Sequence, residues 1–301
     1  MSGSAANVVL QYAVDNDIFQ SFGLDVRLTD TDSGSASVTA LVANDFQICQ
    51  VAGTPVVNGV AAGADLVIVG GLINQQIYSL VVRPEIEAPE DLMGKAVAAS
   101  RAGGASDLSI RKILTSLDLQ PDIDVTVLAV GGQSERLAAM EAGTVAGTIV
   151  SVPETAWARE LGFGILVDST EMKEPYQHTV LATSRAYLAE NRPVVTNFMK
   201  GVITAIAQMK QDREGAIQSF ARMQKMNPES NEAYFAEAYD VLVRQIIVDE
   251  PYPDVEGVQA LIDSVALENP AGAALNADQL IDASILRSLE ESGFFDDIAS
   301  Q

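Results

Sequence analysis

The feature that most constrains this chain is a segment that occurs twice. Residues 40–46 lead to Pro55, and about a hundred residues later 139–145 lead to Pro153. Each copy ends an apolar helix, makes a tight polar turn and a short β-strand, and opens a second helix near the proline. Two similar α/β units predict two lobes with a cleft between them. Open α/β sheets bind ligands at the carboxyl ends of their strands, where helix N-termini offer free N–H groups.

The composition is that of a folded protein and argues against several classes of function. With 301 residues, 48% of them hydrophobic, the chain can form about two domains. Its 41 acidic and 18 basic residues give a net charge of −23, which opposes binding to nucleic acid or to an anionic membrane. The longest apolar stretch, 56–73, contains polar residues and glycines, so it is not a membrane span. Cys49 is the single cysteine, which excludes an intrachain disulfide.

Hydrophobic periodicity predicts an α/β fold in which strands alternate with helices and form parallel sheets covered on both faces. We expect strands at 24–28, 46–52, 66–72, 78–82, 96–99, 126–130, 147–152, 163–168 and 179–183, and helices at 5–19, 35–43, 54–62, 106–117, 134–142 and 153–161. From Arg185 onward the sequence is almost wholly helical, and this tail must pack on an existing body.

Two connectors rich in proline and glutamate, 83–89 and 171–176, interrupt this pattern. We expect the chain to cross between lobes at each of them. Lobe one would then comprise residues 1–83 and 180–301, and lobe two residues 84–179.

Short phrases in a fixed order resemble a known family over nearly the whole chain. They are Gly23-Leu24-Asp25-Val26, Gly63-Ala64-Asp65, Leu80-Val81-Val82-Arg83, Asp91-Leu92-Met93-Gly94-Lys95, Val130-Gly131-Gly132 and Leu289-Glu290-Glu291-Ser292-Gly293-Phe294. The set resembles the solute-binding proteins of ABC importers, in the branch of nitrate-, sulfonate- and thiamine-precursor-type receptors with the type II periplasmic-binding fold. Two departures stand out. Gln47 and Ala146 occupy positions where the family usually has aspartate. The family's first β-strand has no counterpart before Ala5, so we expect either that this sequence begins late or that another segment fills that place.

The resemblance implies a receptor without catalytic activity that captures a small polar or anionic organic solute by hinge closure. It implies a membrane permease as partner, a monomeric state, and a location in the periplasm or outside the cell, associated with the membrane through the permease. Met1 is followed directly by Ser-Gly-Ser, so we expect any export signal to have been removed from this numbering or never to have existed.

Small and polar residues after the predicted strands are the candidate ligand contacts, because glycine and serine let backbone N–H groups approach a polar head. The set is Ser4, Ser33, Gly34, Ser35, Gly53, Thr54, Gly103, Gly104, Gly132, Gln133 and Ser151. Any single turn is better explained by ordinary loop and cap chemistry, whereas convergence of the set on one cleft favours a ligand.

Four further side chains complete the candidate site. Arg101 follows a strand, where a guanidinium could clamp a carboxylate, sulfonate or phosphonate, or could simply be solvated. Asn74 and Gln75 offer amides to the cleft, or form an exposed hairpin turn. His178 precedes the returning strand and could touch the ligand, although a lone histidine in a connector is more often structural.

Enzymes of the same fold are the alternative. A pyrimidine-synthase-like enzyme would need pyridoxal phosphate on a lysine paired with a histidine, and a cysteine-rich motif. A relative of porphobilinogen deaminase would need a cysteine in a loop, whereas Cys49 lies in a predicted strand. Lys95 precedes its strand and should lie opposite the cleft. No metal-ligand spacing is present either. We therefore expect no enzyme activity, no cofactor and no metal.

Overall fold

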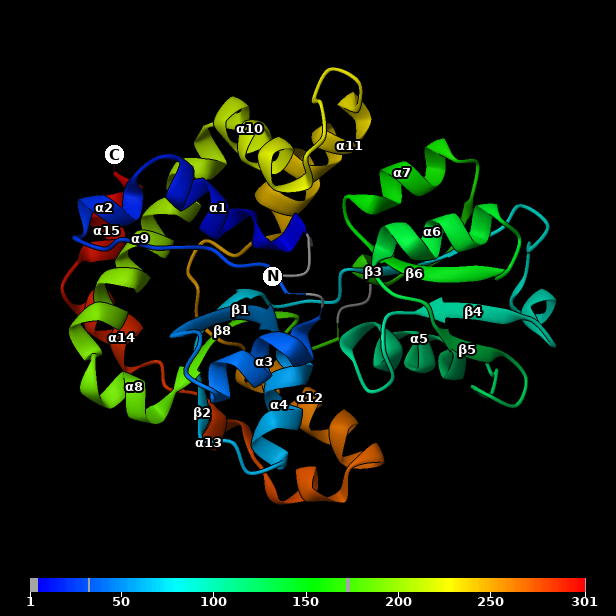
Figure 1. The fold of residues 1–301 in the computed structure, drawn as a ribbon, viewed down its shortest axis with the longest axis horizontal. Helices are drawn as coiled ribbons and strands as arrows, with labels where there is room; N and C mark the ends of the chain where they lie inside the picture. The colour runs from blue at the N-terminus through cyan, green and yellow to red at the C-terminus, as the bar shows by residue number, and fades with distance from the viewer. Residues whose placement is uncertain (1–4, 32, 172–173, 301) are drawn as a thin grey trace. The chain divides into compact units, whose positions relative to one another are not determined.

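The structure is a computed structural model that describes residues 5–31, 33–171 and 174–300. The chain forms two compact units, Met1–Gln75 with Glu174–Gln301, and Gln76–Lys173. Each unit contains one sheet, with strand order β1-β8-β2 in the first and β5-β4-β6-β3-β7 in the second (Figure 1). The α/β fold class predicted from the sequence is therefore confirmed.

The sheet of the first unit consists of β1 (Ile48–Ala52), β8 (Thr179–Ser184) and β2 (Leu66–Ile73). β8 lies between the other two and runs antiparallel to both. The prediction of a parallel sheet is wrong here for a topological reason. The chain leaves this sheet at the carboxyl end of β2 and re-enters it at the same edge, where His178 N donates to Ile73 O at 2.9 Å. β8 therefore starts where β2 ends and runs antiparallel to it.

Helices cover this sheet and continue to the C-terminus, as the sequence predicts. α3 (Gly34–Val42) and α4 (Gly53–Ala61) pack on β1 and β8. The amino-terminal part forms η1 (Ala5–Asn7), α1 (Val8–Asp15) and α2 (Ile18–Ser21). The carboxyl-terminal part forms α8 (Arg185–Glu190), α9 (Arg192–Gln211), α10 (Arg213–Gln224), α11 (Glu232–Glu237), a π-helix η4 (Ala238–Ile246), α12 (Val255–Glu268), η5 (Pro270–Ala274), α13 (Ala277–Leu280), α14 (Ser284–Glu291) and α15 (Phe294–Ala299).

Residues 24–28, predicted as a strand, are not one. Their exposure does alternate, with Leu24, Val26 and Leu28 half-buried and Asp25 and Arg27 exposed. The alternation makes the segment extended, but no strand pairs with it in the described part of the chain. Among those residues none before α1 forms a strand either, since η1 begins at Ala5.

The sheet of the second unit combines both strand directions. β4 (Ala96–Ala99) is parallel to β5 (Thr126–Ala129) and β6 (Gly147–Ser151), as expected, whereas β3 (Tyr78–Val82) is antiparallel to β6 and β7 (Gly164–Asp168). From the sequence, the first crossing is expected at the connector 83–89. Because β3 belongs to this sheet, the chain crosses before Tyr78 instead.

Two apolar layers hold the helices of the second unit to its sheet. Leu80 and Val82 face the layer of α5 (Ala105–Ser116), and Val81 faces the layer of α6 (Gln133–Glu141) and α7 (Glu154–Glu160). In Figure 1, α5 lies on one face of the sheet and α6 and α7 on the other. Short 3-10 turns, η2 (Pro89–Leu92) and η3 (Ser169–Glu171), complete the unit. α5 follows β4, α6 follows β5 and α7 follows β6, so the three helices begin at the carboxyl edge of the sheet.

Candidate functional site

In the first unit, β1 leads directly into α4 at Gly53 and Thr54. Gly53 N donates to His178 O at 2.9 Å, and a Cβ on Gly53 would lie 2.7 Å from the carbonyl oxygen of Gln177, so only glycine fits. Thr54 is fully buried, and among the described residues its Oγ1 has no hydrogen-bond partner. A buried hydroxyl without a partner is costly, which makes Thr54 the strongest predicted contact in this unit.

Asn74 lies at the same edge, but its amide is engaged within the protein. Asn74 Nδ2 donates to Tyr252 O at 3.0 Å, and Gln177 Nε2 donates to Asn74 Oδ1 at 2.8 Å. Gln177 Oε1 in turn accepts from Asp254 N at 2.7 Å. These bonds fasten the segment before α12 to the sheet. Gln75, the next residue, is half-buried.

His178 is buried beside β2. Its Nδ1 lies 2.8 Å from Thr179 Oγ1, and burial lowers the pKa of the imidazole to about 4. The ring is therefore neutral at pH 7.

The turn before α3 has a local structural role. Ser33 is the N-cap of α3, and its Oγ accepts from Ala36 N at 3.2 Å. A Cβ on Gly34 would lie 2.8 Å from Cγ of Pro55, so glycine allows α3 to approach α4. Ser35 O accepts from the hydroxyl of Thr39. Ser4 lies outside the described residues.

In the second unit, the turn before α5 is closed by an acidic side chain. Gly103 N donates to Asp107 Oδ2 at 2.8 Å, and Asp107 Oδ1 pairs with Arg111 Nε at 3.0 Å. Gly104 is the N-cap of α5. The side chain of Arg101 is exposed, and in the described structure it forms no hydrogen bond or ion pair.

The turn before α6 joins two predicted contacts, Gln133 and Ser151. Ser151 N donates to Gln133 Oε1 at 2.6 Å, and Gln133 Nε2 donates to Ser151 Oγ at 2.9 Å. Ser151 Oγ also lies 3.2 Å from Glu154 Oε2. Gly132 is exposed, and a Cβ there would lie 2.6 Å from Glu135 Oε2, so the Glu135 carboxylate covers the start of α6.

Arg136 of α6 contacts this turn through Gly131 O, and it was not predicted from the sequence as a residue of the site. It is 2% exposed and donates to Thr148 Oγ1 at 3.1 Å, Gly131 O at 2.6 Å and Ile149 O at 2.7 Å. These partners are neutral, and no carboxylate of the described residues lies within ion-pair distance. Burial lowers the pKa of its guanidinium, because the charged form loses hydration.

The sequence did carry a signal for Arg136. One face of α6 carries Gln133, Arg136, Leu137 and Met140. Arg136 is therefore a charged residue on the helix face that packs against the sheet. The guanidinium of Arg136 holds the carbonyl of Gly131 by a hydrogen bond and places a positive charge next to the turn before α6. Arg101, Gly103 and Gly104 follow β4, Gly132 and Gln133 follow β5, and Ser151 is the last residue of β6. Because these strands are parallel neighbours, all six residues lie at one edge of this sheet.

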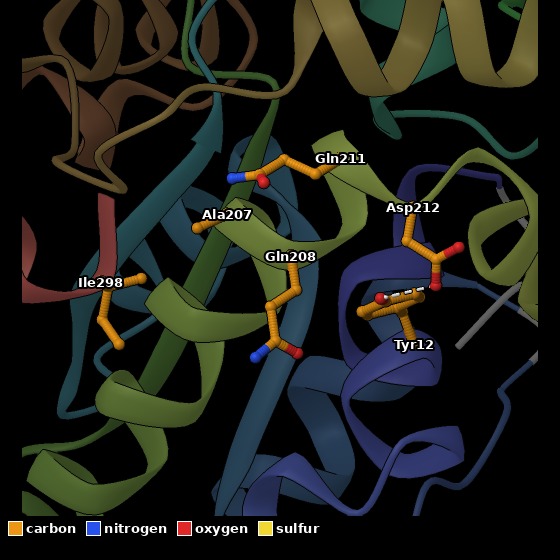
Figure 2. A pocket seen from close by; sticks show the side chains of 6 residues that line it. All are labelled: Tyr12, Ala207, Gln208, Gln211, Asp212 and Ile298. Atoms are coloured by element: carbon orange, nitrogen blue, oxygen red, sulfur yellow. Dashed lines mark hydrogen bonds between the residues drawn. The ribbon is translucent and has the colours of Figure 1, made fainter. Parts of the chain in front are cut away.

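A depression of about 300 Å³ lies elsewhere in the first unit, between α1, α9 and α15. Figure 2 shows the side chains that line it, with Tyr12 and Asp212 joined by a hydrogen bond of 3.0 Å. Asp212 also caps α10 by accepting from Gly215 N, and burial together with this carboxylate raises the pKa of Tyr12. The depression contains none of the predicted contacts.

Two further classes of site are absent from the described part of the chain. No group of histidine, cysteine and acidic side chains there could hold a metal ion. Nor does any helix of those residues combine the length and apolar character needed to cross a membrane.

Comparisons with known proteins agree on the fold. The chain resembles the nitrate-binding protein NrtA of Synechocystis PCC 6803 with a TM-score of 0.78 at 13% identity, over 96% of this chain and 86% of that one. It resembles the aliphatic sulphonate-binding protein SsuA of Escherichia coli with a TM-score of 0.76 at 19% identity, over 92% and 89%. The alkanesulfonate-binding SsuA of Xanthomonas axonopodis pv. citri, bound to MOPS, gives 0.73 at 20%, over 94% of each chain.

No curated protein sequence matches the chain. The sequence profile of the family described as "NMT1/THI5 like" matches residues 7–216, more than half of the chain. The chain belongs to the NMT1/THI5-like family.

Proposed function

We propose that this protein is the solute-binding component of an ABC importer, which captures a small polar or singly charged anionic organic molecule and delivers it to a membrane permease. The observation that carries the proposal is the edge of the second sheet, where three helices begin at small-residue turns with the Gln133 and Ser151 pair and the exposed Arg101. NrtA and SsuA, which bind nitrate and sulfonates, share the fold.

The charges at this edge restrict the solute. Asp107 accepts a hydrogen bond from the turn before α5, and Glu135 covers the turn before α6, so two carboxylates stand where a helix N-terminus would attract an anion. Arg136 and Arg101 offset them. A neutral molecule or a monoanion is therefore favoured over a dianion, because these charges roughly cancel and leave no net positive charge to hold two negative ones.

The function rests on hinge closure in this proposal, because interactions with the solute that form only in the closed state shift the equilibrium towards that state. Thr54 supports a contribution from the first unit, since its buried hydroxyl lacks a partner among the described residues. A periplasmic or extracellular location and a monomeric state complete the proposal.

A thermal-shift screen tests it, because a ligand of the folded state raises the unfolding temperature. The panel contains nitrate and short alkanesulfonates as monoanions, sulfate as a dianion, and uncharged pyrimidines. We expect a saturable shift with a monoanion or a neutral compound and none with sulfate, and small-angle scattering should then show a smaller radius of gyration with the hit. A shift with sulfate alone would contradict the charge argument, and no change in radius would contradict closure.

A pyrimidine-synthase-like enzyme is the alternative, and the lysines argue against it. Lys95 is exposed at the amino end of β4, and Lys210 pairs with Asp249 in the first unit. No lysine of the described residues lies at the carboxyl edge of either sheet. Incubation with pyridoxal phosphate and then borohydride should give no stoichiometric adduct at one site. A single labelled lysine together with turnover would favour the enzyme.

A further inference from the structure

Three segments of the first unit meet at one side chain, the amide of Gln177. The chain leaves this unit after Gln75 and returns to it at Glu174, so an outgoing connector follows β2 and a returning connector precedes β8. The third segment is the loop 247–254, which joins η4 to α12. Gln177 lies on the returning connector and is fully buried.

The amide of Gln177 forms hydrogen bonds with all three segments. Its Nε2 donates to Asn74 Oδ1 on the outgoing connector at 2.8 Å, and to Ile73 O and Thr179 O at 3.1 Å each. Its Oε1 accepts from Asp254 N, in the loop before α12, at 2.7 Å. One planar group therefore ties the first-unit ends of both connectors to each other and to this loop.

These bonds require a side chain that both donates and accepts. A carboxylate at position 177 could not donate to the three oxygens, and an apolar side chain would also leave Asp254 N without its acceptor. Because the site is buried, each group left without a partner destabilises the arrangement. The chemistry of the surroundings thus selects an amide.

Two glycines make room for this amide. A Cβ on Gly71 would lie 2.8 Å from Gln177 Oε1, and a Cβ on Gly257 would lie 2.7 Å from Gln177 N. Both separations are shorter than an ordinary van der Waals contact, so a larger residue at either position would displace Gln177. Gly71 N also donates to Pro251 O at 2.9 Å, which holds the loop before α12 against β2.

The same side chain lies beside the predicted solute contacts of the first unit. Its bond to Asn74 Oδ1 orients that amide, whose Nδ2 then donates to Tyr252 O at 3.0 Å. The next residue along the chain, His178, accepts from Gly53 N at 2.9 Å, and Gly53 begins the turn that carries Thr54. The connectors and the turn before α4 are therefore fixed at one place.

We propose that Gln177 is a positioning residue for hinge closure, which holds the first-unit ends of both connectors together and so limits the orientations open to the second unit. A hinge changes the backbone angles of a few residues, and this bond set confines the change to the connector residues beyond Asn74 and before Gln177. Fewer accessible orientations leave a larger fraction of molecules able to close on a solute, so the apparent affinity rises. This last step rests on the proposed function.

The test measures the distance between the units without a solute. Spin labels are placed at Glu141→Cys in α6 and Glu291→Cys in α14, which are both exposed, in a Cys49→Ala background. Pulsed electron double resonance gives the distribution of distances between the labels. We expect Gln177→Met to broaden this distribution, because the connectors lose their common anchor.

Gln50→Met is the matched control. Gln50 is also a buried glutamine of the first unit, and its Nε2 donates to a backbone oxygen, Ala6 O, at 2.6 Å. A loss of stability common to both changes should leave the width of the distribution unaltered in Gln50→Met. Unchanged width in Gln177→Met, or equal broadening in both variants, would overturn the proposal.

Hydrogen exchange and solute binding give two further readouts. The amide of His178, which bonds to Ile73 O, should exchange roughly tenfold faster in Gln177→Met, and unchanged exchange would contradict the role of Gln177. If this variant does not fold, Asn74→Ala decides by the same distance measurement, since it removes the bond from Gln177 to the outgoing connector and spares its other bonds. A broadened distribution without any solute in the screen would support the role of Gln177 and contradict the proposed function.

Discussion

Gln133 of α6 and Ser151 of β6 form a reciprocal pair, in which Ser151 N donates to Gln133 Oε1 at 2.6 Å and Gln133 Nε2 donates to Ser151 Oγ at 2.9 Å. The pair ties the beginning of a helix to the end of its neighbouring strand. The amide of Gln133 therefore holds the turn before α6 in place. Because its oxygen and its nitrogen both bond to Ser151, it is less able to bond to a solute as well.

Removing this tie should destabilise the second unit. We expect Gln133→Ala to lower the free energy of unfolding by about 1–2 kcal/mol, because the N–H of the buried Ser151 loses its acceptor. Urea denaturation measures the change. Ser134→Ala is the matched control, since Ser134 is the next residue, is exposed and should change stability by less than about 0.5 kcal/mol. Equal effects of the two changes would contradict the role of the pair.

Arg136 should not tolerate lysine. Lysine retains the charge but cannot reach Thr148, Gly131 O and Ile149 O in the planar geometry of a guanidinium. We expect Arg136→Lys to cost about 2–4 kcal/mol of stability in urea denaturation, because it leaves buried groups unsatisfied. The exposed pair Arg27 and Asp25 supplies the control, and Arg27→Lys should be nearly neutral. A tolerated lysine at position 136 would show that charge alone suffices there.

The sequence predicted the elements of the fold well, because periodicity and small-residue turns are local signals. β3 and β4 have the predicted bounds, and most other strands differ by one or two residues. The direction and the pairing of strands depend on residues that are far apart in the sequence. β8 runs antiparallel because of where the chain re-enters its sheet, and residues 24–28 have the alternation of a strand without a partner to pair with.

The candidate site was predictable in its location and less so in its chemistry. The end of a strand and the turn that follows it mark the edge of a sheet, so Ser151 and Gly132 could be found from sequence. The partners of Asn74 could not, because Tyr252 and Gln177 are far away in the chain. Arg136 was overlooked although its place on an apolar helix face was visible.

Arg101 offers the direct test of an anionic ligand. If a monoanion binds, we expect Arg101→Ala to weaken it roughly ten- to a hundredfold, which corresponds to a charge-assisted contact of about 1.5–3 kcal/mol. Calorimetry with the hit from the screen gives the affinity. Arg101→Lys should recover part of it, because the charge remains. An unchanged affinity in Arg101→Ala would make this residue a solvated loop arginine.

His178 should make stability depend on pH below neutrality. Burial lowers its pKa to about 4, so between that value and its usual 6.5 the unfolded chain binds a proton that the folded protein does not. Stability is therefore full above pH 6.5 and falls as the pH drops, by about 2 kcal/mol between pH 7 and pH 5. Urea denaturation of the protein and of His178→Asn at both values measures this. His178 is the only histidine, so the variant should lose most of the dependence.

Cys49 should be unreactive until the protein unfolds. It lies buried in β1, its Sγ donates to Ser37 O at 3.3 Å, and burial raises the pKa of the thiol to about 12 from 9.0. The thiolate is the reactive form, so at pH 8 its population falls roughly a thousandfold, and access is blocked as well. We expect a disulfide reagent to label the folded protein at the rate of unfolding, and the urea-unfolded chain within seconds. Because Cys49 is the single cysteine, every labelled molecule reports this site. Rapid labelling without urea would show that β1 opens locally, and the exchange rate of the Cys49 amide would then locate the opening.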